Sequence, residues 1–450
     1  MNVHFISIGG SAMHNLALAL HDKGDHITGS DDAIFEPSKS RLKEKGLLPD
    51  ALGWFPEKIH VGLDAIILGM HAKADNPELI RAQELGIEIY SYPEFLYEHA
   101  KNKTRVVIGG SHGKTTITSM ILHVLKYHGI EVDFMVGAQL DGFDRMVHLT
   151  DKNEVIVLEG DEYLSSPIDL RPKFHLYKAN IGLISGIAWD HINVFPTFEN
   201  YVDQFKIFVD TMVKGGMMVY NEEDPEVKKV VEETSNQIKK YPYKTPEYSI
   251  ENGMTLLDTA EGEIPLEIFG KHNLQNLEGA RSICFHLGVS EEEFYEAIAD
   301  FKGASKRLEK IGENEQTVIF KDFAHSPSKV EATTNAVKEQ YANRKLLACL
   351  ELHTYSSLNE DFLKEYVGTL DKADEAVVFY SPHAVKIKRL KEVSEQQIAK
   401  AFNRDNLIVY TDPKAFKDFL FSKNLEDSAV LLMSSGNYGG LDFEEVKELL

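Results

Sequence analysis

The chain has 450 residues, 43% of them hydrophobic and 26% charged, with a formal net charge of −23 at pH 7. This composition is typical of a soluble globular protein with a sizeable core, and the length suggests about three domains. No apolar run reaches the roughly 20 residues of a membrane span, and the acidic balance argues against nucleic acid as a partner. The first residues, MNVHFISIGG, lack the basic segment of a signal peptide, and two cysteines are too few for a disulfide framework. We therefore expect a cytoplasmic protein with no membrane span.

The amino-terminal part of the chain alternates strand-like and helix-like runs. Strand patterns occupy residues 3–8, 26–31, 65–70 and 87–92, and a helical pattern occupies residues 12–20. This alternation predicts a small parallel sheet. The first turn, SIGGSAMHN, is similar to a dinucleotide-binding turn, although Ser7 and Ala12 replace glycines, and Asp31 lies where a ribose-binding acid would. A ligand site at Gly9 and Gly10 and a tight structural turn remain equal alternatives.

A second motif, VVIGGSHGKTT, lies between an apolar run and a helical pattern. This position predicts a phosphate-binding loop, because backbone N–H groups near Gly110 and Gly113 can approach an anion and the helix N-terminus adds a favourable dipole. Lys114 would supply positive charge from an exposed loop, and the Thr115 hydroxyl can bind Mg²⁺. The alternative is a glycine-rich turn that only caps a helix, since Ile108 occupies a position that is commonly glycine.

Carboxylates follow two further strand-like runs. Glu159, Asp161 and Glu162 follow the run VIVL, and Asp190 and His191 follow the strand expected at residues 181–187. Ligands in open α/β sheets bind at the carboxyl ends of strands. We therefore predict that Thr115, Glu159 and His191 hold Mg²⁺ against the phosphates of ATP. Solvated acids and a loop histidine are the alternative.

Three later segments carry further candidates. GKHNLQN places Asn273 and Asn276 one helical turn apart, where their amides could pair with the edge of a base. ASKRL offers Arg307, and KDFAHSP offers Asp322 and His325 directly after a strand. Each of these residues, taken singly, could instead be structural.

The order of these motifs resembles that of the Mur ligase family, whose members use ATP to add amino acids or peptides to a UDP-sugar precursor of peptidoglycan. The resemblance covers nearly the whole chain. The family's short Gly-x-x-Gly-Lys-Thr loop matches Gly110 to Thr116. Further family positions match Lys114, Glu159, His191, Asn273, Asn276, Arg307 and Asp322.

The resemblance implies an α/β protein with the three-domain Mur ligase architecture. A Rossmann-like domain for the UDP-sugar would occupy residues 1–101, a central P-loop ATPase sheet residues 102–303, and a Rossmann-like domain for the amine residues 304–450.

The resemblance also implies roles for particular residues. Lys114, Glu159, His191 and Arg307 would act in catalysis, and Thr115, Glu159 and His191 would bind Mg²⁺. The implied ATP site comprises Gly110, Ser111, His112, Gly113, Lys114, Thr115, Thr116, Asn273, Asn276, Arg307 and Asp322. The implied UDP-sugar site comprises Gly9, Gly10, Ser11, Ala12, Met13, Ser30 and Asp31.

The motifs SIGGSAM, GSD and GSHGKTT are similar to the branch of the family that uses UDP-N-acetylmuramate. EGDEY, DFAHSP and SSGNYGGLD favour enzymes that add the tripeptide L-alanyl-γ-D-glutamyl-meso-diaminopimelate; addition of L-alanine is the alternative. The reaction would be an ADP-forming C–N ligation through an acyl phosphate. The amine substrate would meet His325, His353, Lys386, Lys388, Arg389, Gly436, Gly439 and Gly440. An alternative of another class is a nucleotide-binding switch that does not ligate.

Lys206 lies on the helical pattern of residues 197–212. Several relatives carry a carbamylated lysine near this offset, and a carbamate would place a negative charge beside a second Mg²⁺. The other interpretation is a surface lysine whose stem lies along the helix.

Overall fold

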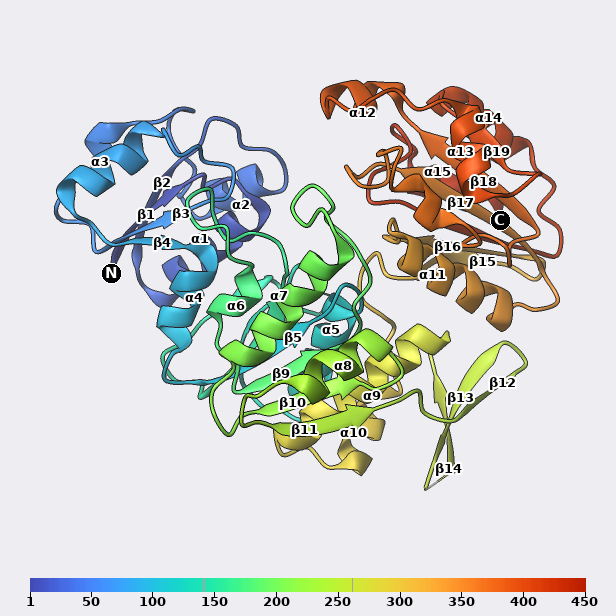
Figure 1. The fold of residues 1–450 in the computed structure, drawn as a ribbon, viewed down its shortest axis with the longest axis horizontal. Coiled ribbons are helices and arrows are strands. Elements are labelled where there is room, and N and C mark those ends of the chain that lie inside the picture. The colour runs from blue at the N-terminus through green and yellow to red at the C-terminus, as the bar shows by residue number, and fades with distance from the viewer. Residues whose placement is uncertain (141, 261) are drawn as a thin grey trace. The chain divides into compact units, whose positions relative to one another are not determined.

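The computed structural model describes residues 1–140, 142–260 and 262–450, and it has the α/β fold expected from the sequence (Figure 1). The chain divides into two compact units. One comprises Met1–Ile187 and Val202–Pro242, and the other comprises Ala188–Tyr201 and Tyr243–Leu450. None of the described helices is long and apolar enough to cross a bilayer. The boundaries at residues 101 and 303 stay a prediction.

The first unit begins with a four-stranded parallel sheet in the order β2-β1-β3-β4. Its strands are β1 (Asn2–Ile6), β2 (His26–Ser30), β3 (Ala65–Leu68) and β4 (Ile89–Ser91), and its helices are α1 (Ser11–Lys23), α2 (Ser38–Glu44), α3 (Pro77–Leu85) and α4 (Tyr92–Ala100), with the short 3₁₀ helix η1 (Pro56–Lys58). All four strands expected from the sequence are present. The first turn directly follows β1 and therefore lies at the carboxyl edge of this parallel sheet, where ligands of such sheets bind.

The first unit also contains a seven-stranded sheet in the order β11-β10-β9-β5-β8-β6-β7. Its strands are β5 (Thr104–Gly109), β6 (Asp133–Met135), β7 (Val147–His148), β8 (Val155–Gly160), β9 (Ile181–Ile184), β10 (Met217–Asn221) and β11 (Lys239–Tyr243). The helices in this stretch of the chain are α5 (Lys114–Tyr127), α6 (Lys173–Leu176), α7 (Phe198–Thr211) and α8 (Pro225–Glu233). Because β5 pairs in parallel with both β8 and β9, the loops that follow these three strands emerge at one edge.

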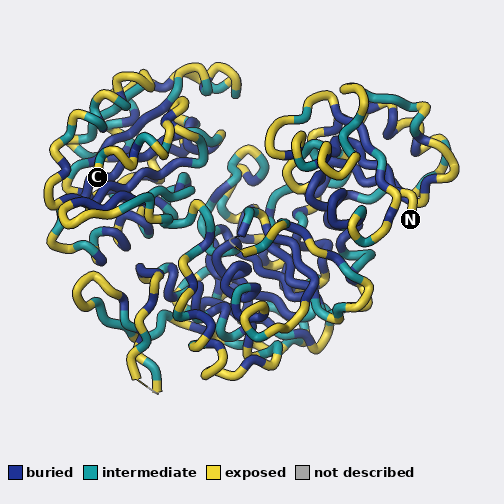
Figure 2. Tube along the Cα trace, turned by 180° about the vertical axis from the view of Figure 1, so that it is seen from behind, coloured by how far each residue is buried: buried dark blue, intermediate teal, exposed yellow. Residues whose placement is uncertain are grey.

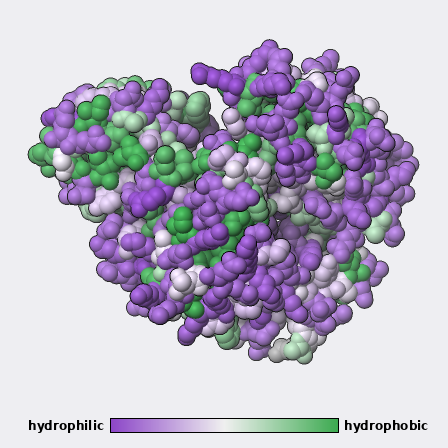
Figure 3. Space-filling view, in the orientation of Figure 1, coloured by the Kyte–Doolittle hydropathy of each residue, from purple (hydrophilic) through white to green (hydrophobic). Residues whose placement is uncertain are grey.

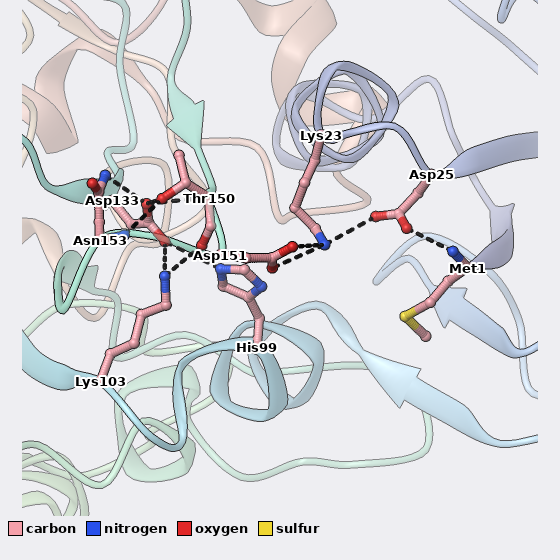
Figure 4. Close-up of polar contacts among 9 residues, drawn as sticks. All are labelled: Met1, Lys23, Asp25, His99, Lys103, Asp133, Thr150, Asp151 and Asn153. Atoms are coloured by element: carbon pink, nitrogen blue, oxygen red, sulfur yellow. Dashed lines mark hydrogen bonds and ion pairs between the residues drawn. The ribbon is translucent and has the colours of Figure 1, made fainter.

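A buried carboxylate joins α4 to the seven-stranded sheet (Figure 4). Asp133, at the start of β6, is fully buried. Its partners are His99 Nε2 at 3.1 Å, Lys103 Nζ, Thr150 Oγ1 at 2.9 Å and Asn153 Nδ2 at 3.0 Å. Beside this cluster, Lys23 of α1 reaches Asp151 at 3.2 Å. These contacts fix the segment that leads from the first sheet into β5.

The second unit contains a three-stranded antiparallel sheet that the sequence patterns did not indicate. It comprises β12 (Tyr248–Glu251), β13 (Met254–Thr259) and β14 (Gly262–Leu266), and is followed by α9 (Lys271–His286) and α10 (Glu291–Ile298). This sheet contacts α11 (Pro327–Gln340), where Thr255 Oγ1 donates to Gln340 Oε1 at 3.0 Å.

The second unit ends in a six-stranded sheet in the order β15-β16-β20-β17-β18-β19. Its strands are β15 (Glu309–Glu313), β16 (Thr317–Asp322), β17 (Lys345–Leu352), β18 (Glu375–Tyr380), β19 (Ile408–Tyr410) and β20 (Ser428–Met433). The remaining helices are α12 (Pro382–Ile387), α13 (Glu395–Phe402), α14 (Pro413–Ser422) and α15 (Phe443–Val446), with the 3₁₀ helices η2 (Leu363–Tyr366) and η3 (Lys447–Leu449).

The central strands of this sheet are buried (Figure 2), and their residues divide between two core clusters. Along β17, Ala348 and Leu350 pack into one core cluster, whereas Leu347 and Cys349 pack into the other. Successive strand residues point to opposite faces, so a strand buried on both sides reads as a continuous apolar run. On the face of the molecule shown in Figure 3, most residues at the surface are hydrophilic.

Candidate active site

The phosphate loop joins β5 to α5. Gly110 has φ +139°, and a Cβ there would lie 2.1 Å from Ser185 Oγ, so the turn requires glycine. Gly113, with φ +81°, is the N-cap of α5, whose first residue is Lys114. The loop therefore leads directly into the N-terminus of a 14-residue helix. This is the arrangement in which backbone N–H groups and the helix dipole bind phosphate.

Lys114 is not the exposed lysine that the sequence led us to expect. Its Nζ lies 2.7 Å from Glu162 Oε2, and the two side chains are only 13% and 1% exposed. It also donates to Gly110 O. Burial alone would lower the pKa of Lys114, but Glu162, together with Asp161 and Glu159, raises it above its usual value. The ammonium group therefore stays charged beside the loop.

Thr115 and Glu159 form the pair that fits a metal bound to phosphate. Thr115 Oγ1 donates to Glu159 Oε1 at 3.0 Å, and the Gly137 N–H donates to Glu159 Oε2 at 2.8 Å. Among the described residues, no group of three or more His, Cys, Asp or Glu side chains is arranged to hold a metal. Mg²⁺ needs few protein ligands, because phosphate oxygens and water complete its coordination. A hydroxyl and a carboxylate next to a phosphate loop meet that requirement.

His191 lies in the second unit, within Ala188–Tyr201. Its φ is +54°, and its N–H donates to Asp190 Oδ1 at 2.8 Å. Asp190 Oδ2 is 3.5 Å from Lys329 Nζ. Burial alone would raise the pKa of Asp190, but Lys329, His191 and His325 lower it, so the carboxylate stays ionised. Because Thr115 belongs to the first unit, the three-residue metal set stays a prediction.

Arg307 and Asp322 lie near the start of the six-stranded sheet. Asp322 accepts hydrogen bonds from the N–H groups of Leu308 and Ala324, which fixes the turn that enters β15. Burial raises the pKa of Asp322, and Arg307 partly offsets that effect. The Arg307 guanidinium stacks over the Phe323 ring at 4.7 Å. Asp322 thus has a structural role whether or not it meets a ribose.

Asn273 and Asn276 share one buried face of α9. The Asn273 amide donates to Phe269 O at 3.0 Å, across the first turn of the helix. One of its two amide hydrogens is therefore used within the helix start. Its role in binding adenine stays a prediction.

The first turn of the chain is held by Asp31. Its Oδ2 accepts the Gly9 N–H at 2.7 Å, and the N–H groups of Ser7 and Ile8 both donate to Ser30 O. A Cβ at Gly9 would lie 2.8 Å from Ile34 Cγ1, so the close approach of this loop requires glycine. The turn therefore serves the fold, and its UDP-sugar role stays a prediction. The other expected residues, Gly10, Ser11, Ala12 and Met13, lie at the start of α1 or directly before it.

Several residues expected at the amine lie at the carboxyl edge of the six-stranded sheet. His325 follows β16, His353 follows β17, and Gly436, Gly439 and Gly440 follow β20. These strands are neighbours in the order β16-β20-β17. Burial lowers the pKa of His325 to about 4, so this imidazole is neutral at physiological pH. Lys386, Lys388 and Arg389 lie in and directly after α12, which follows β18; Lys386 and Arg389 are exposed, and Lys388 is half-buried.

The sequence matches three domain descriptions in this same order. They are "Mur ligase family, catalytic domain" at residues 2–104, "Mur ligase middle domain" at residues 108–284 and "Mur ligase, glutamate ligase domain" at residues 306–436. A UDP-N-acetylmuramate–L-alanine ligase from Caldicellulosiruptor saccharolyticus is 32% identical over 88% of this chain and 88% of that protein. The chain belongs to the Mur ligase family.

Further relatives of this Mur ligase extend along its whole length. A UDP-N-acetylmuramate–L-alanine ligase from Carboxydothermus hydrogenoformans is 29% identical over 98% of the chain and 95% of that protein. The solved UDP-N-acetylmuramate–alanine ligase from Thermotoga maritima covers 100% of this chain and 98% of its own, with a TM-score of 0.71 and 19% identity. A murein peptide ligase from Psychrobacter arcticus does the same with a TM-score of 0.66 and 21% identity. The three-domain Mur ligase architecture expected from the sequence is therefore confirmed.

Two carboxylates of this Mur ligase were not singled out as site residues from the sequence. Glu162 is the partner of Lys114, and Glu351 lies beside His353 at the end of β17. Glu351 interrupts the apolar run LLACLEL, and an acid in a strand that is buried on both faces is the signal that could have revealed it.

Lys206 lies on the surface of α7. Its Nζ is 2.8 Å from Asp203 Oδ1, and its side chain is 48% exposed. A carbamate at this position would place a second negative charge against Asp203. The surroundings therefore favour the surface lysine over the carbamate.

Proposed function

We propose that this Mur ligase joins the carboxylate of UDP-N-acetylmuramate to an amine, with ATP as the energy source. The observation that carries the proposal is the contact of Thr115 Oγ1 with Glu159 at 3.0 Å, directly beside the buried Lys114 ammonium. A hydroxyl, a carboxylate and a lysine at the start of a helix are the groups that hold Mg²⁺ and the phosphates of a nucleotide. The fit of these residues supports ATP and Mg²⁺ at this loop.

The proposed chemistry activates a poor electrophile. The γ-phosphoryl group of ATP is transferred to the muramate carboxylate, ADP leaves, and the resulting acyl phosphate is attacked by the amine to give an amide and phosphate. Mg²⁺, when bound by Thr115, Glu159 and His191, would neutralise charge on the phosphate oxygens. Lys114 would stabilise the same charge, and Arg307 would reach the phosphates only when the site closes.

The preference for a tripeptide acceptor, drawn from the sequence, has less support than its alternative. Relatives that share about 30% identity along the chain are named UDP-N-acetylmuramate–L-alanine ligases. L-Alanine is therefore our first proposal for the acceptor. The tripeptide remains a second candidate because the segment of residues 382–391 carries several exposed cations, including Lys386 and Arg389, at the edge where an acceptor with extra carboxylates would extend.

The first experiment measures phosphate release from ATP with and without UDP-N-acetylmuramate and an amine. We expect release only when the UDP-sugar is present, with amide product accumulating when the amine is added. ATP hydrolysis that ignores both substrates would instead support a nucleotide-binding switch and overturn the ligase proposal.

The second experiment lets L-alanine and the tripeptide compete for limiting UDP-N-acetylmuramate, and identifies the product by mass. We expect UDP-N-acetylmuramoyl-L-alanine to dominate. A dominant tripeptide product, by about 100-fold in kcat/KM, would require about 3 kcal/mol of extra contacts and would restore the tripeptide assignment. The matched control replaces Lys386 and Lys388 with Gln, which should reduce only a tripeptide preference.

A further inference from the structure

A histidine and a buried carboxylate form a pair at the carboxyl end of β17. Glu351 Oε1 lies 3.5 Å from His353 Nδ1, and the two side chains are 3% and 42% exposed. Glu351 follows Leu347 and Cys349 on the same face of the strand, and both of those residues belong to the apolar core. A carboxylate in such a place is costly unless charged or polar partners surround it.

The remaining partners of Glu351 come from the segment after β20. Ser434 Oγ donates to Glu351 Oε2, and the Tyr438 N–H donates to the same oxygen at 2.8 Å. Burial alone would raise the pKa of Glu351, but His353, Ser434 and the Tyr438 N–H lower it below its usual value. The carboxylate is therefore ionised at neutral pH and faces the Nδ1 side of the imidazole.

Gly436 keeps the space beside the pair open. A Cβ at this position would lie 2.8 Å from Glu351 Oε2 and 2.9 Å from His353 Nδ1. Glycine therefore lets the loop after β20 pass close to both side chains. The imidazole is held from one side by Glu351 and Gly436, and its other side remains accessible at the edge where ligands of open α/β sheets bind.

We propose that His353 is the base that deprotonates the acceptor amine, and that Glu351 is a positioning residue that orients the imidazole. This inference rests on the proposed ligase function. An α-amine is largely an ammonium ion at neutral pH and has no lone pair for attack on an acyl phosphate. His353 Nε2 accepts one proton from the ammonium and becomes imidazolium, while Glu351 faces the proton on Nδ1. The free amine then forms the C–N bond as the acyl C–O bond to phosphate breaks, and its second proton leaves to solvent.

The surroundings of His353 suit a base. Among the described residues, Glu351 is the charged side chain that lies against the imidazole ring of His353. The other titratable side chain of this cluster is Tyr438. Its Oη lies 2.7 Å from Cys349 O and 2.9 Å from Met433 O, two carbonyls that share its single proton, so it faces the core. A carboxylate on one ring nitrogen fixes the tautomer and leaves the other nitrogen as the acceptor. The separation of 3.5 Å is longer than a hydrogen bond, as catalytic contacts often are before substrate binds.

The test uses two nucleophiles that differ in their need for a base. Hydroxylamine is mostly uncharged at neutral pH and traps an acyl phosphate as a hydroxamate, whereas an amino acid must first lose a proton. For His353→Gln, we expect the ratio of amide to hydroxamate formed from the same UDP-sugar to fall about 100-fold, the usual contribution of a general base. His383→Gln, which changes another histidine at the same edge of the sheet, is the matched control and should keep the wild-type ratio. An unchanged ratio in His353→Gln would overturn the proposal.

The pH dependence separates a base from a residue that only supports the loop. For Glu351→Gln, we expect the acidic limb of the kcat/KM profile for the amine to move to lower pH, because the imidazolium loses a neighbouring negative charge. A lower kcat with no shift in the acidic limb of the pH profile would show that Glu351 only supports the loop. That result would overturn the role of Glu351 in orienting His353. A protonated His353 that bound the acceptor's carboxylate would instead give a KM that rises with pH, contrary to the proposal.

The same assay separates the failure of this inference from the failure of the proposed function. If the wild-type enzyme gives neither hydroxamate nor amide from ATP and UDP-N-acetylmuramate, the ligase function itself is wrong. If the wild type gives both products and His353→Gln leaves their ratio unchanged, only the role of His353 is wrong.

Discussion

Replacing Lys114 with Ala should unfold the first unit more easily as well as abolish turnover. The Lys114 and Glu162 side chains are 13% and 1% exposed, so removing the ammonium takes a charged partner away from a buried carboxylate. Breaking a buried ion pair from one side costs about 3–5 kcal/mol, which is a large part of the stability of a typical domain. An exposed lysine, as expected from the sequence, would instead contribute less than about 1 kcal/mol.

The measurement is urea unfolding of Lys114→Ala followed by circular dichroism, with the two units' transitions analysed separately because a chain of this size need not unfold in one step. The matched control is the double variant Lys114→Met with Glu162→Gln, which removes both charges and should recover most of the loss. The pKa of Lys114 is raised in the folded state. Its stabilisation is therefore fully present below the ordinary value of about 10.5 and is lost only as pH rises beyond it.

Two results would contradict this reasoning. A Lys114→Ala protein as stable as the wild type at neutral pH would mean that Glu162 is solvated or repaired by another group. A double variant as unstable as Lys114→Ala would mean that the loss comes from packing rather than from the removal of a charged partner of Glu162.

Three further substitutions test other parts of the molecule. Glu159→Gln should raise the Mg²⁺ concentration for half-maximal activity at least about ten-fold, and an unchanged Mg²⁺ titration would remove Glu159 from the metal set. Asp133→Asn leaves the buried Lys103 without its carboxylate and should cost about 3–5 kcal/mol in urea unfolding at pH 7. Burial would raise the pKa of Asp133, but His99 and Lys103 lower it. The wild type should therefore lose its stability advantage over Asp133→Asn as pH falls below about 3.8. A difference in stability that persists at lower pH would point to packing. Lys206→Met should change stability by less than about 0.5 kcal/mol, and any dependence of activity on bicarbonate that disappears in this variant would revive the carbamate.

The backbone of the site could be predicted from the sequence because each part depends on a local pattern. Gly110 and Gly113 mark a turn with positive φ between a strand and a helix, and the acid after VIVL marks a strand end. Such patterns require only strand and helix periodicities and the conformational freedom of glycine. The antiparallel sheet of β12, β13 and β14 was missed because its strands are half exposed and carry no long apolar run.

The pairing of charges could not be predicted from the sequence, because it depends on contacts between distant segments. Lys114 and Glu162 are 48 positions apart, and nothing in either segment indicates which of Glu159, Asp161 and Glu162 meets the lysine. Glu351 and Ser434 are 83 positions apart and are brought together only by the pairing of β17 with β20. Side-chain burial is likewise a tertiary property, which is why Lys114 was expected to be exposed.

These pairings have a common consequence for ligand binding. Lys114, which is expected to meet a phosphate, already has the carboxylate of Glu162 at 2.7 Å, and Lys329 lies 3.5 Å from Asp190. A nucleotide must therefore exchange a protein carboxylate for a phosphate oxygen at Lys114, so the net gain in free energy is smaller than that of a new ion pair. His353 differs in this respect, because its carboxylate partner contacts one ring nitrogen and leaves the other open to the acceptor. In the proposed reaction, the first arrangement limits the free energy gained when a nucleotide binds at Lys114, and the second leaves one nitrogen of His353 for the amine.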